Sequence, residues 1–285
     1  MFDSTQYQLL DFGDCRRLER FGPVVLDRPC PAAESMQPAD PELWSSADAR
    51  FERFEGESGR WALRGDPPHR WTIAHDRMTL ELKRTDFGHV GLFPEQAENW
   101  DWIADQVRRN SSGAASPMRI LNLFAHTGAS TLAAAAAGAA VTHVDAARNI
   151  VAWARRNAEL SGLQCAPIRW IAEDAAKFVN REIRRGNRYD AVILDPPSYG
   201  HGAHGEVWRL AQDLPPLLAL CADLTTPRPR FVLLTCHTPG FSPLRLHELM
   251  TAGFGPARVA AASLELTAST GRILPSGVTA RWTAE

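Results

Sequence analysis

In the second half of the chain, short apolar segments alternate with segments of helical composition. Residues 119–124 (RILNLF), 140–145 (AVTHVD), 189–195 (YDAVILD) and 230–235 (RFVLLT) have the length and apolar content of buried strands. Segment 147–162 (ARNIVAWARRNAELSG) alternates apolar and charged positions as an amphipathic helix does, and segment 206–224 (EVWRLAQDLPPLLALCADL) is also predicted to be a helix. Repeated strand and helix units with apolar strands predict a parallel, doubly wound α/β sheet covered by helices. Ligands of such sheets bind at the carboxyl ends of the strands.

The first half of the chain has a different pattern. Short runs such as RWTIAH (70–75) and MTLELK (78–83) are separated by Pro, Gly and Asp clusters, which is typical of β structure. Residues 94–110 have helical spacing, and the polar segment 110–117 (NSSGAASP) has the composition of a linker. We therefore predict a small β-rich domain at 1–93, a helix and linker at 94–117, and a ligand-binding domain at 118–285.

Composition excludes several classes of protein. The 285 residues are 45% apolar and 22% charged, with no signal-peptide pattern and no long uncharged apolar stretch, so we expect a cytoplasmic protein without a membrane span. Five scattered cysteines without a CxxC pair argue against a disulfide framework and a structural zinc site, and we predict no metal. The net charge of −2 means that any nucleic-acid partner requires a local basic face.

A polar or conformationally special residue follows each predicted strand. The first strand leads into a turn with Gly128, the second ends at Asp145, the third at Asp174, the fourth in DPPSYG (195–200), and the fifth runs into Cys236. A glycine lets the backbone approach a ligand, and strand-end carboxylates can bind the hydroxyls of a ribose or the amine of an adenine. This set predicts an adenosine-shaped site. Taken singly, Asp145 or Asp174 is better explained as a helix cap than as a ligand, and it is the complete ordered set that favours the site.

The turn FAHTGAS (124–130) contains one glycine. A nicotinamide-binding fold is expected to have three glycines in this turn. The sequence therefore argues against a dehydrogenase.

Residues 121–163, followed by AVILDPPSYG (191–200), resemble the class I S-adenosylmethionine-dependent methyltransferases, in particular the branch with bacterial large-subunit ribosomal RNA methyltransferases. The resemblance extends from Phe87 to the C-terminus. It implies a seven-stranded Rossmann-like sheet, S-adenosylmethionine as cofactor, and a base of RNA, ribosomal RNA in that branch, as substrate. The cofactor residues that it implies are Asn122, Phe124, Thr127, Gly128, Asp145, Asp174, Asp195, Pro196 and Pro197. One departure is His126, which stands where the family often has tyrosine.

Two chemistries are open for the fourth and fifth strand ends. An Asp-Pro-Pro-aromatic motif serves amine methylation by accepting hydrogen bonds from the target amine and stacking the base. Here Ser198 follows DPP, and Tyr199 or Phe241 remains for stacking. Methylation at carbon 5 of a pyrimidine requires a thiolate that adds to carbon 6. The segment LLTCHT (233–238) resembles the Thr-Cys-Ser segment of RNA cytosine-5 methyltransferases, with Cys236 at the nucleophile position and Asp195 as its catalytic partner on the ring.

The alternative for Cys236 is a small buried apolar residue, the usual role of a free cysteine at the end of a strand. The sequence leaves both roles open. His237 could lower the pKa of the thiol if it is protonated nearby.

Basic residues offer a local surface for RNA. Residues 176–188 contain Lys177, Arg181, Arg184, Arg185 and Arg188, and Arg155 and Arg156 form a second pair; such clusters also occur on ordinary solvated helices. We expect RNA as the partner. Methylation of a small molecule or protein, and a non-catalytic RNA-binding role for the same fold, remain alternatives, and the oligomeric state is left open.

Overall fold

The structure is a computed structural model that describes residues 2–54, 58–111, 116–201, 207–225, 227, 229–256 and 258–284. The chain forms two compact units, one containing Met1–Glu98 and Glu265–Ser276 and the other Asn99–Leu264 and Gly277–Glu285. The predicted linker falls in part on residues 112–115, which lie outside the described residues.

The first unit is β-rich, as predicted. Its five-stranded sheet has the order β1-β2-β3-β4-β5, and a separate hairpin pairs β6 with β7. The strands are β1 (Tyr7–Gly13), β2 (Arg16–Phe21), β3 (Val24–Pro29), β4 (Ala49–Arg53), β5 (Gly59–Leu63), β6 (Arg70–His75) and β7 (Met78–Lys83). Three short 3-10 helices, η1 (Pro31–Ala33), η2 (Pro41–Ser46) and η3 (Pro94–Gln96), lie along the same stretch of chain. Phe12, Phe21 and Phe51 are fully buried in this unit.

Residues 265–276 belong to the first unit although they lie near the end of the chain. The backbone amide of Ser269 donates to the carbonyl of Leu9 at 2.9 Å, and its hydroxyl donates to the carbonyl of Leu10 at 2.7 Å. Arg272 contacts the carboxylate of Asp11 at 3.4 Å. These contacts fix the segment against β1.

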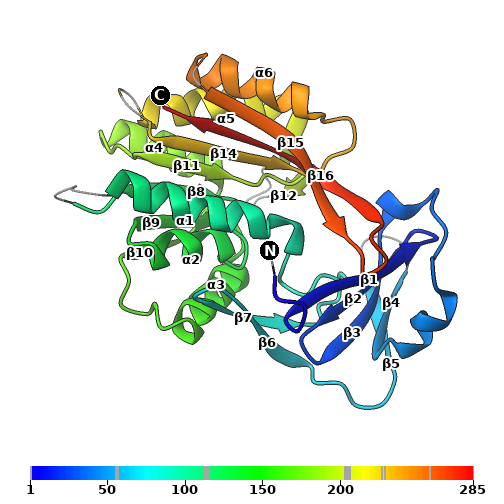
Figure 1. Ribbon diagram of the computed structural model, residues 1–285. Helices are drawn as coiled ribbons and strands as arrows, with labels where there is room; N and C mark the ends of the chain where they lie inside the picture. Colours follow the sequence, from blue (N-terminus) through cyan, green and yellow to red (C-terminus); the bar gives the residue numbers. More distant parts are fainter. Residues whose placement is uncertain are drawn as a thin grey trace. The chain divides into compact units, whose positions relative to one another are not determined.

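The second unit contains the predicted seven-stranded sheet (Figure 1), in the order β10-β9-β8-β11-β14-β16-β15. The five strands from β10 to β14 pair in parallel, and β16 is antiparallel to β14. The strands are β8 (Arg119–Leu123), β9 (Ala140–Asp145), β10 (Ile168–Ala172), β11 (Ala191–Leu194), β14 (Phe231–Cys236), β15 (Arg258–Thr267) and β16 (Ile273–Thr283). The strand order reverses between β8 and β11, which is where such sheets bind ligands.

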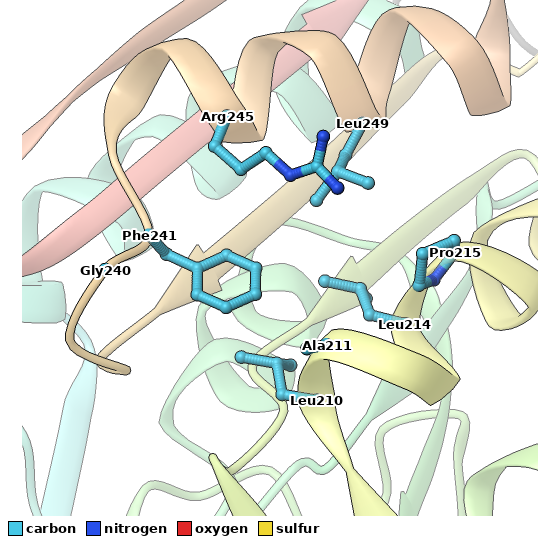
Figure 2. Close-up of a pocket in the computed structure, with 8 residues that line it drawn as sticks. All are labelled: Leu210, Ala211, Leu214, Pro215, Gly240, Phe241, Arg245 and Leu249. Carbon is cyan, nitrogen blue, oxygen red and sulfur yellow. The ribbon is translucent and has the colours of Figure 1, made fainter.

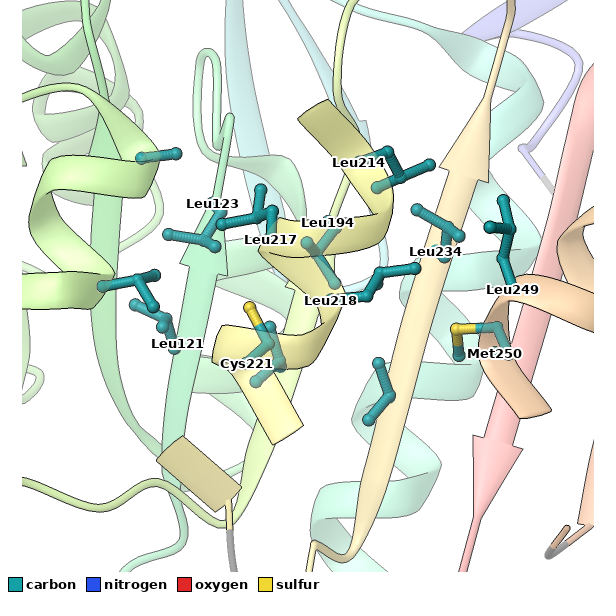
Figure 3. Close-up of a cluster of buried hydrophobic side chains, with 14 of the residues drawn as sticks. Leu121, Leu123, Leu194, Leu214, Leu217, Leu218, Cys221, Leu234, Leu249 and Met250 are labelled. Carbon is teal, nitrogen blue, oxygen red and sulfur yellow. The ribbon is translucent and has the colours of Figure 1, made fainter. Parts of the chain in front are cut away.

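Helices cover both faces of this sheet because its inner strands are apolar on both sides. In β11, Ala191 and Ile193 pack with residues of α1 and α2, whereas Val192 and Leu194 pack with residues of α4, α5 and α6. The second of these clusters is drawn in Figure 3. The helices are α1 (Ala97–Ser111), α2 (Ala129–Ala136), α3 (Arg148–Leu160), α4 (Ala175–Arg184), α5 (Leu210–Thr225) and α6 (Pro243–Phe254).

The fifth helix differs from the prediction. The sequence suggested a helix from 206 onward, but residues 207–209 form a short strand, β13 (Val207–Arg209), paired with β12 (Tyr199–His201). α5 begins at Leu210, where the carboxylate of Asp213 accepts a hydrogen bond from the backbone amide of Arg209 at 2.6 Å. A carboxylate that satisfies an unpaired amide in this way marks a helix start.

In the described ranges, no helix has both the length and the apolar content needed to cross a membrane. Within the same ranges, no group of three or more His, Cys, Asp or Glu residues could hold a metal ion.

Candidate active site

The carboxyl ends of four neighbouring strands bring the predicted residues to one edge of the sheet. Leu123 of β8 pairs with Val144 of β9 and with Leu194 of β11, and Leu194 pairs in turn with Leu234 of β14. The residues that directly follow these positions are Phe124, Asp145, Asp195 and Thr235. The parallel register therefore gathers the turn after β8, the DPPS segment and the end of β14 at one edge of the sheet, on either side of the point where the strand order reverses.

The turn after β8 has an unusual backbone. Phe124, His126 and Gly128 have φ values of 54°, 47° and 90°, in the left-handed region that residues other than glycine adopt at roughly 1 kcal/mol each. The amide of Ala125 donates to the carbonyl of Val144 at 3.1 Å, and the amide of Gly128 donates to the carbonyl of Ala125 at 3.0 Å. A Cβ atom at Gly128 would lie 3.0 Å from the Cβ atom of Ala154. Backbone strain of this kind concentrates at functional sites.

Asp145 holds this turn from the end of β9. Its Oδ2 atom accepts from the amide of His126 at 2.9 Å, and its Oδ1 atom accepts from the amide of Ala147 at 3.0 Å. The N-cap of α3 is Ala147, so Asp145 lies outside the capping position that the alternative interpretation gave it. A carboxylate has about four lone-pair positions, and two amide donors leave capacity for the two hydroxyls of a ribose.

Asp174 differs from Asp145. It is the N-cap of α4, and its Oδ1 atom accepts from the amide of Lys177 at 2.9 Å. This is the capping geometry that the sequence left as the alternative.

Asn122 and Thr127 are buried beneath the turn. The side-chain amide of Asn122 donates to the hydroxyl of Thr131 at 2.9 Å, and that hydroxyl lies 3.0 Å from Nδ1 of His143. Burial, together with the charge of His126, lowers the pKa of His143 to about 3, so its imidazole is neutral, and the tautomer decides which of Thr131 and His143 donates. The carbonyl of Thr127 accepts from the side-chain amide of Asn157 at 2.9 Å. These polar groups hold the turn from below.

Phe124 and Pro197 of the DPPS segment both contact Trp208, a residue that no pattern in the sequence singles out. The ring of Phe124 lies 4.9 Å from that of Trp208, and the indole nitrogen of Trp208 donates to the carbonyl of Pro197 at 2.7 Å. Pro196 is buried and Pro197 is exposed. The sequence predicts a helix at Trp208, so no signal in the sequence connects this residue with the site.

Asp195 lies between two partners from the end of β14. Its Oδ1 atom accepts from the hydroxyl of Thr235 at 2.5 Å and lies 3.5 Å from Nε2 of His237. Burial alone would raise the pKa of Asp195, but the hydrogen bond and charge of His237, followed by the hydroxyl of Thr235, lower it below its ordinary value. Its side chain is 33% exposed, so the ionised carboxylate can reach a bound molecule.

Cys236 ends β14 and is 1% exposed, among the apolar residues between the sheet and α5. Burial raises the pKa of its thiol, and the nearby charge of Asp195 acts in the same direction. The Sγ atom accepts from the amide of Thr238 at 3.4 Å, a contact that favours the thiolate. The hydroxyl of Thr238 lies 2.6 Å from that of Ser198, which joins this loop to the DPPS segment.

Gly277 of β16 packs against the end of β14, next to Cys236 and His237. Its φ is 124°, and a Cβ atom there would lie 2.8 Å from the carbonyl oxygen of Cys236 and 2.8 Å from Nδ1 of His237. A side chain at this position must therefore displace the His237 ring or the end of β14.

Replacement of Gly277 with alanine is expected to lower the free energy of unfolding by roughly 2–3 kcal/mol, because strain at positive φ adds to the steric overlap. Gly271 is the matched control: its φ is 82° and a Cβ atom there has no neighbour within 4 Å, so Gly271→Ala should lower the same free energy by about 1 kcal/mol. Urea denaturation of both variants measures the difference. Equal losses would mean that His237 moves aside without resistance.

Two of the five basic residues named at 176–188, Arg181 and Arg185, have carboxylate partners in the protein. Arg181 contacts Glu173, and Arg185 contacts the buried carboxylate of Glu182 at 3.7 Å, as does Arg169 of β10 at 3.5 Å. Because a buried carboxylate holds its partner in place, Arg185 is a weaker candidate for an RNA surface than the sequence suggested. In the second cluster, Arg156 contacts Glu159 at 3.1 Å across exposed side chains, a pair that a phosphate can replace.

Comparison with known proteins agrees with this geometry. Residues 40–260 match the model of a family described as S-adenosylmethionine-dependent methyltransferase. The crystal structure of a SAM-dependent methyltransferase from Agrobacterium tumefaciens is 37% identical, with a TM-score of 0.91, and the match covers 98% of this chain and 91% of that one. A protein from Streptococcus mutans, 18% identical with a TM-score of 0.76 over 98% of this chain and 75% of its own, shares the fold.

Two curated relatives match part of the chain. Ribosomal RNA large subunit methyltransferase I of Aeromonas hydrophila is 31% identical over 66% of this chain, and methyltransferase K/L of Hahella chejuensis is 34% identical over 55%. The matched regions are 46% and 20% of those proteins, so the chain spans less than half of their length. The family match covers most of the chain, and the match to the Agrobacterium structure covers nearly all of it. The chain therefore belongs to the family of S-adenosylmethionine-dependent methyltransferases, enzymes whose cofactor is S-adenosylmethionine.

Proposed function

We propose that this enzyme transfers the methyl group of S-adenosylmethionine to a base of ribosomal RNA. The observation that carries the proposal is the set of curated relatives, whose names are those of ribosomal RNA large subunit methyltransferases and whose matches reach 66% of this chain. RNA is then the partner, and the cytoplasm, where ribosomes are assembled, is the expected compartment.

We assign the cofactor to the turn after β8 and the adjoining strand ends. S-adenosylmethionine supplies an electrophilic methyl group when bound. Gly128, Phe124 and Thr127 would border its methionine part, and Asp145 would bind its ribose with the lone pairs left by two amide donors. Asp174 would reach the adenine amine with the lone pairs that are not used in capping α4. Asn122 supports the turn from below through Thr131.

Asp145 provides a direct test of this assignment. Asp145→Asn is expected to raise the dissociation constant of S-adenosylmethionine roughly tenfold or more, because one acceptor for the ribose becomes a donor. Asp190 is a matched control, since its carboxylate also accepts a backbone amide, that of Arg119 at 2.7 Å, but at the amino end of β11. Isothermal titration calorimetry should give an unchanged dissociation constant for Asp190→Asn. Equal weakening in both variants would remove Asp145 from the cofactor site.

The finer form of the proposal is methylation of cytosine at carbon 5. Cys236, as a thiolate, would add to carbon 6, and carbon 5 would then take the methyl group. A base would remove the carbon 5 proton, and elimination would release the thiolate. Asp195 would hydrogen-bond the ring nitrogen N3 during the addition, and Pro196 and Pro197 would lie between cofactor and base. In support, Cys236 and Asp195 end adjacent strands, and the amide of Thr238 donates to the Sγ atom.

A second candidate for the group that receives the methyl is an amine of a base, hydrogen-bonded to the DPPS segment. The observation that favours it is the burial of Cys236, because burial keeps a thiol protonated and protects it from substrate.

The experiment that tests the function is mass spectrometry of nucleosides from unmodified ribosomal RNA after incubation with the enzyme and deuterium-labelled S-adenosylmethionine. Labelled 5-methylcytidine supports the finer form, and a labelled N-methyl base supports the amine. Absence of label in RNA, with the cofactor bound, would contradict the proposal and favour a small molecule or protein as substrate. A non-catalytic RNA-binding role would be favoured if Asp195→Ala also left the protein's biological role intact.

A further inference from the structure

A pocket of about 300 Å³ lies in the second unit, beside the site described above (Figure 2). It is formed by the start of α5, the loop after β14, and the first turns of α6. Its lining residues are Leu210, Ala211, Leu214, Pro215, Gly240, Phe241, Arg245 and Leu249. The volume is at the lower end of the roughly 300–1,000 Å³ typical of ligand pockets.

Two groups in the lining can recognise a ligand. Phe241 presents a half-buried aromatic ring, and Figure 2 shows the guanidinium of Arg245 on the same side of the pocket. The remaining lining residues are apolar and include three leucines, Leu210, Leu214 and Leu249, which exclude water.

Hydrogen bonds connect this pocket to the DPPS segment. The amide of Leu210 donates to the carbonyl of Ser198 at 3.2 Å, and the amide of Phe241 donates to the carbonyl of Thr238 at 3.2 Å. The hydroxyls of Ser198 and Thr238 are themselves 2.6 Å apart. Since His237 contacts Asp195 and Phe241 follows four residues later, the pocket and the reacting end of the site share one short loop.

We propose that this pocket binds an unpaired base of the substrate RNA that flanks the methylated nucleotide, with its ring on Phe241 and its phosphate on Arg245. This inference rests on the proposed function. An aromatic ring and a guanidinium are the pair of groups with which proteins hold single-stranded nucleotides. Arg245 contacts Glu248 at 3.3 Å across exposed side chains, an exchangeable pair that a phosphate can replace.

Two variants address the pocket from opposite directions. Phe241→Ala removes the ring, whereas Ala211→Trp fills the pocket from the exposed start of α5 and leaves the other lining side chains unchanged. Phe241→Tyr keeps a stacking ring and should retain binding. Leu244, which is 68% exposed on α6 and is not among the lining residues, gives the control Leu244→Ala.

The probe is an unmodified transcript of large-subunit ribosomal RNA, with binding followed by filter retention at several salt concentrations and methylation followed by label. Phe241→Ala and Ala211→Trp should each raise the KM for RNA roughly tenfold and leave the dissociation constant of S-adenosylmethionine unchanged. Arg245→Ala should reduce the slope of log affinity against log salt by about 0.7, the value for one phosphate of a single strand.

The outcomes separate this inference from the function on which it rests. If the native enzyme methylates the transcript but Phe241→Ala and Ala211→Trp keep its KM and Arg245→Ala keeps its salt slope, the pocket proposal is wrong and the function stands. If the native enzyme leaves the transcript unlabelled, the function fails, and the pocket proposal fails with it.

Discussion

Replacing Asp195 with asparagine is expected to slow methyl transfer by roughly a hundredfold to ten-thousandfold without unfolding the chain. Asparagine keeps the shape of the side chain and can still accept from the hydroxyl of Thr235, which is 2.5 Å from Oδ1 in the native protein. It loses the negative charge that His237 contacts at 3.5 Å and the capacity to exchange a proton with a substrate ring. Single-turnover incorporation of labelled methyl groups measures this loss.

The control for Asp195 is Asp223→Asn, because Asp223 is exposed on α5 and belongs to no part of the site. A native rate in Asp195→Asn would contradict the proposed role. The lowered pKa of Asp195 also fixes the sign of its pH dependence. Because its pKa is lowered, the carboxylate of Asp195 stays ionised through the pH range in which an ordinary aspartate titrates. Any stability that its charge contributes is fully present above that range and is lost only as the pH falls through the folded pKa. Its titration should therefore leave the rate unchanged between about pH 6 and 8.

Much of the second unit follows from local patterns in the sequence. The strands β8, β9, β11 and β14 are compact apolar runs, and burial on both faces is the reason for their composition. The two last strands escaped the sequence analysis. β15 (RVAAASLELT) is mostly exposed or half-buried, so it lacks an apolar signal. The contact of Ser269 with Leu10 spans 259 residues, and no local pattern specifies such a pairing.

The candidate site was less accessible to sequence reasoning than the fold. Asp145 and Asp174 have the same sequence signature, a carboxylate after a strand, yet Asp174 caps α4 and Asp145 holds the turn after β8. Their backbone partners distinguish them, and these depend on the register of the sheet. Trp208 was missed for a different reason. The sequence predicts that it lies in a helix, whereas it lies in β13 and contacts Phe124.

If Cys236 is the nucleophile, Cys236→Ala should reduce methyl transfer roughly a thousandfold or more, because carbon 5 of a pyrimidine is unreactive until a thiolate adds to carbon 6. Cys221 is a closely matched control. It is 0% exposed in the same apolar cluster, and burial raises the pKa of its thiol to about 12. Cys221→Ala should cost a similar free energy of unfolding, about 1 kcal/mol, and keep the native rate.

The pH dependence of the rate separates the two roles of Cys236 by a second route. Burial raises the pKa of this thiol, so the thiolate is a minor species near neutral pH and its fraction grows about tenfold per pH unit below the pKa. A thiolate mechanism therefore predicts a single-turnover rate that keeps rising from pH 7 to 9. A flat profile together with an active Cys236→Ala variant would assign Cys236 to the core and the chemistry to an amine held at the DPPS segment. The rate of the Cys236→Ala variant and the pH profile are independent tests. Removal of a merely structural cysteine could lower the rate, but a structural cysteine could not make the rate rise with pH in this way.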